Sequence, residues 1–210
     1  MVNFMLNDII STKDELRTLL GEPSQRAEAK VIHKLDDHCR TILAHSPFLV
    51  LSTSNEDGTC DASPRGDAPG FVYVIDDHHI VIPERPGNKR IDSLQNIVSN
   101  PHVGLLFMIP GMEETLRLNG KAYITRNEDL LEKMEVGQKI PQLGIIVKIE
   151  EIYIHCAKAL IRSKLWSSET WPNRKELPTM ATIVKAHAEL KESTVEIEES
   201  LQESYTTRLY

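Results

Sequence analysis

Residues 80–122 read IVIPERPGNKRIDSLQNIVSNPHVGLLFMIPGMEETLRLNGKA, and the order of elements in this stretch decides the fold. A short apolar run ends at Pro83, and a glycine-containing turn with several cations follows it. We expect a helix from Ile91 to Ser99, because Asn100 and Pro101 end the helical pattern there. A buried strand is expected from Val103 to Ile109. The stretch therefore predicts a strand, a basic turn, a helix and a second strand in close succession.

The turn before that helix is strongly basic. It carries Arg85, Gly87, Asn88, Lys89 and Arg90, whereas the whole chain has a formal net charge of -7. The amides of a helix N-terminus and a nearby cation together attract a dianionic phosphate. A guanidinium offers paired donors to phosphate oxygens, and a glycine lets the backbone approach a ligand. We interpret the turn as a site for a small anionic ligand; the alternative is a solvated charged turn.

A hairpin is predicted upstream of this unit. Its strands are Phe48 to Thr53 and Thr59 to Arg65, and Asp57-Gly58 is a hairpin turn signal. Pro64 cannot donate to a strand ladder, so the second strand is expected at an edge or a bulge, where free backbone groups can face a ligand. The alternative is a plain bulge with Arg65 in a surface ion pair.

The remaining pattern predicts short strands with a few helices around them. Helices are expected from Thr12 to Gly21, from Ser24 to about Ala44, from Glu128 to Val136 after the cap Asn127, and from Pro178 to Leu190. Strands are expected at Phe71 to Ile75, at His79 to Pro83, at Thr115 to Thr125, and at Gly144 to Ala159 as one long strand or a bent pair. The tail beyond is expected to be mobile at its end. The chain is thus predicted to be mainly β with flanking helices, an antiparallel barrel and not a doubly wound sheet.

From about Ser46 to Trp166 the chain resembles the pyridoxamine 5'-phosphate oxidase-like flavoproteins. The resemblance rests on the order of a strand, a basic turn, a helix ending in Asn-Pro, a Gly-Leu-Leu-Phe strand and a strand ending in Asn-Gly-Lys-Ala. It implies an FMN-binding split β-barrel with antiparallel, Greek-key-like topology. It also implies three parts, which are N-terminal helices in residues 1–45, the FMN-binding domain in residues 46–166, and a C-terminal extension with a helix in residues 167–210.

The resemblance implies a set of FMN-binding residues. In the family an arginine reaches the flavin phosphate from a strand along the flavin, and Arg65 takes that position here, although Gly66-Asp67 follows it where an apolar run is usual. Arg117, with Thr115, falls on the strand that reaches the partner's flavin across a twofold axis, and Trp166 is expected at the ring. The complete set is Ser63, Pro64, Arg65, Gly66, Ile82, Pro83, Asn88, Lys89, Arg90, Thr115, Arg117 and Trp166.

A substrate pocket is predicted after the last long strand. His155, Arg162 and Ser163 lie near an indole there, and polar groups beside an indole can line a pocket against a flavin. The alternative for His155 is a structural role, which is common for a histidine in an apolar strand. The alternative for Arg117 is an exposed arginine on a surface strand. No catalytic residue is assigned, and no histidine shows metal-site spacing together with carboxylates.

The activity implied by the resemblance is that of an FMN-dependent oxidoreductase. Hydride would pass from a small-molecule substrate to flavin N5, and oxygen or another acceptor would reoxidise the flavin. True pyridoxamine 5'-phosphate oxidases have an Arg-x-His element shortly after the late tryptophan, and none follows Trp166. The substrate is therefore unassigned, and the alternatives are a non-catalytic flavin- or haem-binding protein on the same barrel, or a true pyridoxamine 5'-phosphate oxidase.

Composition and the resemblance together limit the possible binding partners and the cellular compartment. No apolar run approaches the roughly 20 residues of a membrane span, and the N-terminus lacks a secretory pattern. The acidic balance argues against nucleic-acid binding, and three cysteines without CxxC spacing fit a reducing cytoplasm. We expect a cytoplasmic homodimer with FMN at the subunit interface. The helix from Pro178 to Leu190 is expected to cover the flavin entrance.

Overall fold

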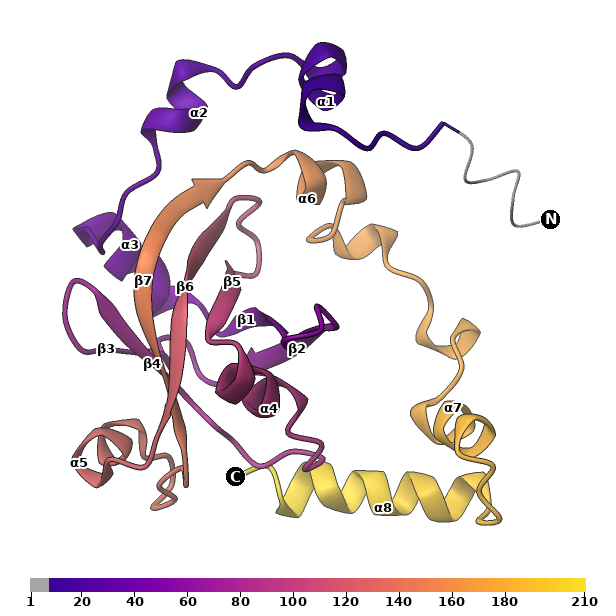
Figure 1. Ribbon diagram of the computed structural model, residues 1–210. Helices are drawn as coiled ribbons and strands as arrows, with labels where there is room; N and C mark the ends of the chain where they lie inside the picture. Colours follow the sequence, from indigo (N-terminus) through magenta and orange to yellow (C-terminus); the bar gives the residue numbers. More distant parts are fainter. Residues whose placement is uncertain (1–7) are drawn as a thin grey trace.

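One antiparallel sheet organises the protein, and the computed structural model describes residues 8–210 of it. The sheet has seven strands in the order β2-β1-β5-β6-β7-β4-β3 (Figure 1). The strands are β1 (Phe48–Ser54), β2 (Cys60–Gly66), β3 (Tyr73–Val74), β4 (His79–Pro83), β5 (His102–Met108), β6 (Thr115–Thr125) and β7 (Gly144–His155). Every pairing is antiparallel, as the sequence predicts, and the sheet is curved but not closed.

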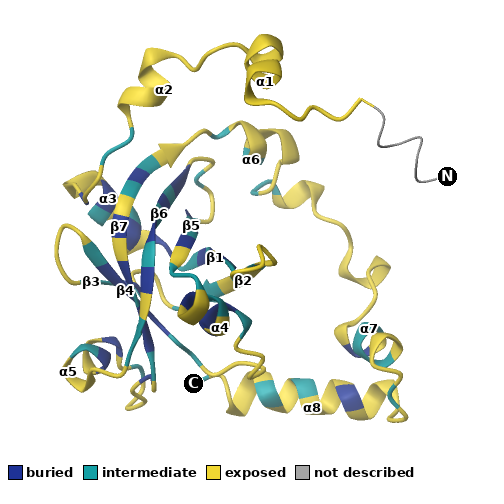
Figure 2. Ribbon diagram, viewed as in Figure 1, coloured by how far each residue is buried: buried dark blue, intermediate teal, exposed yellow. Residues whose placement is uncertain are grey.

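The inner face of the sheet holds the main core. Leu49, Leu51, Leu105, Phe107 and Leu118 are almost fully buried, and they alternate along their strands with half-exposed residues (Figure 2). Such alternation is expected when only one face of a sheet is covered. β2 forms one edge, and its Pro64 lies opposite Val50, so the predicted edge position is confirmed.

A bulge in the longest pairing explains the Asn-Gly-Lys-Ala motif. The register between β6 and β7 shifts between Asn119 and Gly120. A Cβ at Gly120 would lie 2.0 Å from the carbonyl oxygen of Lys148. Only glycine therefore permits this close approach of the two backbones, which bends the sheet toward the barrel shape.

Two helices close the core. α4 (Asp92–Ser99) packs against β1, β6 and β2 and buries Leu94 and Ile97. α3 (Asp37–His45) buries Cys39 and Leu43 in the same cluster. Outside the main core lie α1 (Lys13–Leu20) and α2 (Gln25–Ala29), whereas α5 (Glu128–Leu131) and the 3-10 turn η2 (Glu132–Met134) bury Leu131 and Met134 in a second apolar cluster with Val81. The predicted N-caps Thr12, Ser24 and Asn127 each accept a backbone N–H, which confirms the starts of these helices.

Three sequence predictions need correction. The helix expected from Ser24 to about Ala44 is two helices, because Ile32 is extended and exchanges backbone hydrogen bonds with Ile152 of β7 at 3.0 and 2.8 Å. The strand expected at Phe71 to Ile75 shortens to β3. The strand expected from Gly144 to Ala159 is single and ends at His155, where the chain turns into α6 (Lys158–Ser163).

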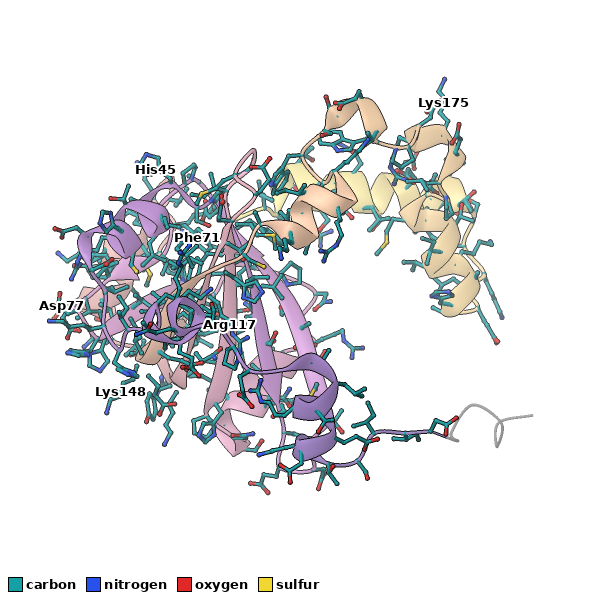
Figure 3. The ribbon with its side chains drawn as sticks, turned by 90° about the horizontal axis from the view of Figure 1, so that it is seen from above. His45, Phe71, Asp77, Arg117, Lys148 and Lys175 are labelled. Atoms are coloured by element: carbon teal, nitrogen blue, oxygen red, sulfur yellow. The ribbon has the colours of Figure 1, made fainter. Side chains whose placement is uncertain are left out.

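Residues 167–210, which we call the C-terminal arm, stand away from the sheet. The arm contains η3 (Ser168–Thr170), η4 (Arg174–Glu176), α7 (Met180–His187) and α8 (Thr194–Thr207). α7 packs against α8, and Lys175 lies at the far end of the arm when the molecule is seen from above (Figure 3). The tail, for which the sequence predicts a mobile end, forms α8, which begins with a capping box between Ser193 and Glu196.

Candidate functional site

A row of polar side chains on β2 faces the inside of the barrel. Asp61, Ser63 and Arg65 lie opposite Thr53, Leu51 and Leu49 of β1, and directly opposed residues of antiparallel strands point to the same face. All three are half-buried. The intervening Pro64 and Gly66 are exposed on the outer face. The pleat of one edge strand thus separates these β2 residues into an inner polar row and an outer apolar one.

Arg65 is the best-buried cation of the candidate site. Its side chain is 14% exposed, and Nη1 pairs with the carboxylate of Glu84. Its Nε is buried and has no hydrogen-bond partner, and no other buried side-chain nitrogen or oxygen within residues 8–210 shares this state. Buried polar groups are nearly always hydrogen-bonded, so an orphaned N–H of this kind points to an acceptor that binds there.

The basic turn approaches Arg65 through Glu84, which begins it. Lys89 and Ile91 have positive φ angles of 61° and 55°, in the left-handed region that non-glycine residues rarely adopt. Strained backbone of this kind persists where the surroundings determine it, often at ligand sites. Asn88 supports the turn, because its Oδ1 accepts the N–H of Arg90 at 3.0 Å. The predicted turn before α4 therefore contains two residues in the left-handed region, and one side-chain hydrogen bond supports it.

The cations of the turn differ in how they are neutralised. Arg90 Nε donates to Asp92 at 2.8 Å, but its side chain is 71% exposed. Lys89 is exposed and has no ion pair in the part of the chain that is described. An exposed pair contributes little free energy, so Arg90 can exchange Asp92 for another anion at small cost. Lys89 and Arg90 are thus available to an anionic ligand.

Arg85 has a different role from the other cations of the turn. Its Nε donates to Asp67 at 2.7 Å and its Nη2 donates to the carbonyl of Met134 at 2.9 Å. Burial alone would raise the pKa of Asp67, but hydrogen bonds from Tyr210, Ala68 and Arg85 and the Arg85 charge outweigh it and lower that pKa. The unusual Gly66-Asp67 sequence therefore serves an ion pair that holds the start of the basic turn.

The start of α4 is linked to β2. Ser93 Oγ donates to Asp61 Oδ2 at 2.6 Å, and Ile91 at the N-cap supplies no side-chain cap. Ile82 and Pro83 are buried at the end of β4, opposite Ile145 and Gly144. They position the turn by packing, and their contact with a cofactor stays a prediction.

A second group of predicted residues lies on the outer face. Arg117 lies opposite Leu106 of β5 and Tyr153 of β7, and its guanidinium lies 5.6 Å from the centre of the Tyr153 ring. Its Nε donates to Asn119 at 3.4 Å. Thr115, two residues earlier, is buried opposite His155. The cation–π contact fixes the direction of Arg117 across the outer face.

The late residues surround the end of β7. Trp166 Nε1 donates to the carbonyl of Met112, in the loop between β5 and β6, at 2.8 Å. The exposed His155 ring lies 6.2 Å from the Tyr153 ring. Arg162 and Ser163 are exposed in α6, and Ser163 Oγ donates to Leu160 O at 3.1 Å. In a single chain, no hydrogen bond or ion pair within residues 8–210 joins this group to Arg65 or to the basic turn.

An open hollow of about 530 Å³ lies along β1, β2 and β5. Small-molecule pockets typically have volumes of about 300–1,000 Å³. Its lining includes Asp61, which also receives the Ser93 hydroxyl at the start of α4. The full lining is Ser52, Thr53, Ser54, Cys60, Asp61, Ala62, His102, Val103 and Gly104.

Sequence reasoning missed the partners of the cations. Glu84, Asp92 and Tyr153 were not singled out, although Glu84 is adjacent to Arg85 and Asp92 is two residues from Arg90.

Among residues 8–210 no group of three or more histidine, cysteine or acidic side chains is placed to hold a metal ion. No helix within the same residues is long and apolar enough to cross a bilayer.

The fold and the basic turn agree with the result of comparing the chain with known families. The sequence profile described as pyridoxamine 5'-phosphate oxidase matches residues 35–156. The chain belongs to the pyridoxamine 5'-phosphate oxidase family. This confirms the resemblance read from residues 46–166, together with the split-barrel fold class. Members of this family are typically flavin-binding proteins.

Several solved structures are similar to the chain. HupZ of Group A Streptococcus is 18% identical, with a TM-score of 0.46 over 57% of this chain and 93% of that chain. An FMN-binding protein of Syntrophomonas wolfei is 13% identical, with a TM-score of 0.45 over 56% of this chain and 83% of that chain. A protein of Clostridium acetobutylicum related to general stress protein 26 is 12% identical, with a TM-score of 0.41 over 56% and 85%. No curated protein sequence matches the chain.

Proposed function

We propose that the protein is an FMN-dependent oxidoreductase whose cofactor phosphate binds between Arg65 and the basic turn. The observation that carries the proposal is the orphaned Nε of Arg65, which is buried next to the segment that holds Lys89 and Arg90. A phosphate oxygen would satisfy that N–H with a charge-assisted hydrogen bond. Ser63 on the same inner row and Asn88 in the turn complete the polar set.

The chemistry of these residues fits a phosphate monoester. Arg65 would contribute a planar, buried guanidinium, whereas Lys89 and Arg90 would contribute exposed positive charge. A turn that already holds the bound conformation would lower the entropic cost of binding. When bound, FMN supplies the hydride-accepting chemistry, and the chain orients it, sets the charge around it and excludes water.

We propose that the working unit is a cytoplasmic homodimer with each flavin at the subunit interface. The support is a row of side chains across the outer face, formed by Pro64, Val50, Leu106, Arg117 and Tyr153 of five adjacent strands. Val50 and Leu106 are only half-buried in the single chain. An apolar face of this width is commonly covered by a second protein surface, and twofold pairing is the commonest form.

The dimer would also bring together the two groups of predicted residues. Among residues 8–210 of one chain, Trp166 and Arg117 make no hydrogen bond or ion pair with Arg65, and in a twofold pair they would approach the flavin held by the partner. His155, Arg162 and Ser163 would then line the substrate side of the same site. In this arrangement residues 46–166 form the FMN-binding domain, the parts before and after it are extensions, and the substrate class is open.

The test compares the affinities of the protein for FMN and for riboflavin, and binding is measured by the quenching of flavin fluorescence. FMN should bind at least about tenfold more tightly, because riboflavin lacks the group that Arg65 would hold, and a charge-assisted hydrogen bond contributes about 1.5–3 kcal/mol. Equal affinities would contradict the phosphate site. Steady-state turnover with added electron donors distinguishes an oxidoreductase from a non-catalytic flavin binder, which would hold FMN without turnover.

A further inference from the structure

The C-terminal arm is attached to the barrel at both of its ends. At its start the indole of Trp166 donates to Met112 O at 2.8 Å. At its end Tyr210 returns to the barrel, after α7 and α8 have run apart from the sheet (Figure 1). Helices of fewer than about 12–15 residues are marginal in water unless they are packed, so the end attachment determines how well α8 is held.

Tyr210 makes three different contacts with three separate segments. Its hydroxyl donates to Asp67 Oδ1 at 2.7 Å. The guanidinium of Arg85 lies 5.5 Å from the centre of its ring. Its main-chain oxygen accepts from Lys139 Nζ at 2.6 Å. The contacts therefore recognise the hydroxyl, the ring face and the backbone of one residue.

The groups that receive Tyr210 are themselves held in place. The Asp67 side chain is 1% exposed, and it accepts from Ala68 N and Arg85 Nε, both at 2.7 Å. Arg85 is fixed in turn by Met134 O. A buried carboxylate requires donors on both oxygens, and the Tyr210 hydroxyl is one of the donors to Oδ1.

We propose that a docking site for a tyrosine residue is formed by Asp67 and Arg85, which contact its side chain, and by Lys139, which binds its main-chain oxygen. Tyr210 fills this site and thereby latches the arm onto the barrel. The site explains why an acid follows Gly66, where the family usually continues with apolar residues. It also explains why Arg85 lies too deep in an ion pair to serve the phosphate.

The latch is adjacent to both segments of the proposed phosphate site. Asp67 is two residues from Arg65, and Arg85 directly follows Glu84, the ion-pair partner of Arg65. Docking of Tyr210 thus restrains the two segments against each other. It follows, resting on the proposed function, that the docked arm slows the release of FMN.

The docking itself is tested without any cofactor. Hydrogen exchange of residues 200–210 is measured in the full chain, in Tyr210→Ala and Tyr210→Phe, and in the matched control Tyr205→Ala. Tyr205 lies in α8, five residues before Tyr210, is 56% exposed and makes no side-chain hydrogen bond within the described residues. Tyr210→Ala should raise exchange about tenfold or more, since a hydrogen bond to a charged acceptor is lost together with the ring contact. Tyr210→Phe should give a smaller rise, and the control should give none.

Equal exchange in Tyr210→Ala and in the full chain would overturn the docking site. Tyr210→Ala and Tyr210→Phe leave every buried residue of the barrel unchanged, so the protein stays folded for the comparison. Asp67→Asn should reproduce the effect, and adding Tyr210→Phe to it should change exchange less than Tyr210→Phe does alone. In FMN-loaded protein, Tyr210→Ala should speed FMN release several-fold. Raised exchange with unchanged release would support the docking site and reject its coupling to the cofactor, whereas a failure to bind FMN would overturn the proposed function alone.

Discussion

Glu84→Gln should strengthen FMN binding and leave riboflavin binding unchanged. Glu84 neutralises Arg65, and a phosphate that binds the same guanidinium would have this carboxylate as a close neighbour of like charge. The substituted amide would remove the negative charge and keep an oxygen that can accept from Arg65. The variant therefore separates the role of Arg65 as a phosphate ligand from its role in a structural ion pair.

The magnitude follows from the burial of the pair. The Arg65 and Glu84 side chains are 14% and 24% exposed. Two charges on either side of one guanidinium, about 6 Å apart, repel by about 3 kcal/mol for each unit of charge at an effective dielectric constant of about 20. Screening by solvent at the open side reduces this, and we take about 1.4 kcal/mol, which is about tenfold in affinity. The cofactor-free variant should lose stability, by about 1–3 kcal/mol, because Arg65 then lacks its counter-charge.

The assay is a titration of flavin fluorescence for both ligands, together with thermal unfolding with and without FMN. We expect a lower melting temperature without FMN, a larger upward shift on adding FMN, and a riboflavin affinity within about twofold of the original, which is about 0.4 kcal/mol. An FMN affinity that is unchanged or weaker would refute the reasoning, because Arg65 would then not be the phosphate ligand. Asp92→Asn is the matched comparison, and its effect should be smaller, since its partner Arg90 is 71% exposed.

Three further predictions concern stability, reactivity and pH. Gly120→Ala should destabilise the protein by at least about 3 kcal/mol in denaturant unfolding, because its Cβ would lie 2.0 Å from Lys148 O. Gly87→Ala is the control and should change stability little, because no atom lies within 4 Å of the added Cβ. Similar losses of stability in the two variants would contradict the bulge argument. A thiol reagent at about pH 8 should modify the exposed Cys60 and Cys156 but not Cys39. Burial, and then the hydrogen bond with Asp36, raises the pKa of Cys39 to about 11. Mass spectrometry of labelled peptides would show the difference. The protection factor of residues 200–210, which is the exchange rate corrected for the intrinsic amide rate at each pH, should fall below about pH 4 and above about pH 10 and stay constant between. The pKa of Asp67 is lowered, so its contribution is lost in acid, and the pKa of Tyr210 is raised by its bond to Asp67, so its contribution is lost in alkali. A constant protection factor in acid would contradict this.

Local signals in the sequence determined most of the elements. The cap residues Thr12, Ser24 and Asn127 mark helix starts correctly, because each satisfies an N–H only three residues away. Asp57-Gly58 marks the first hairpin, with Gly58 at a φ of 81°. The capping box of Ser193 and Glu196 carried the same kind of signal for α8, and we missed it in a glutamate-rich tail.

The tertiary structure decided the features that depend on residues distant in the sequence. The predicted long N-terminal helix breaks because Ile32 pairs with Ile152, a partner that local propensity does not reveal. The basic turn was identified correctly, but the fold of Asp67 decides that Arg85 is held in an ion pair, and the fold of Arg65 decides that Glu84 is neutralised. The sequence by itself thus determined the basic turn before α4 and, through the family resemblance, the split-barrel class. Only the fold left Arg65 Nε without a partner and placed Arg85 against Tyr210, because ion pairs depend on distance in space and not on spacing along the chain.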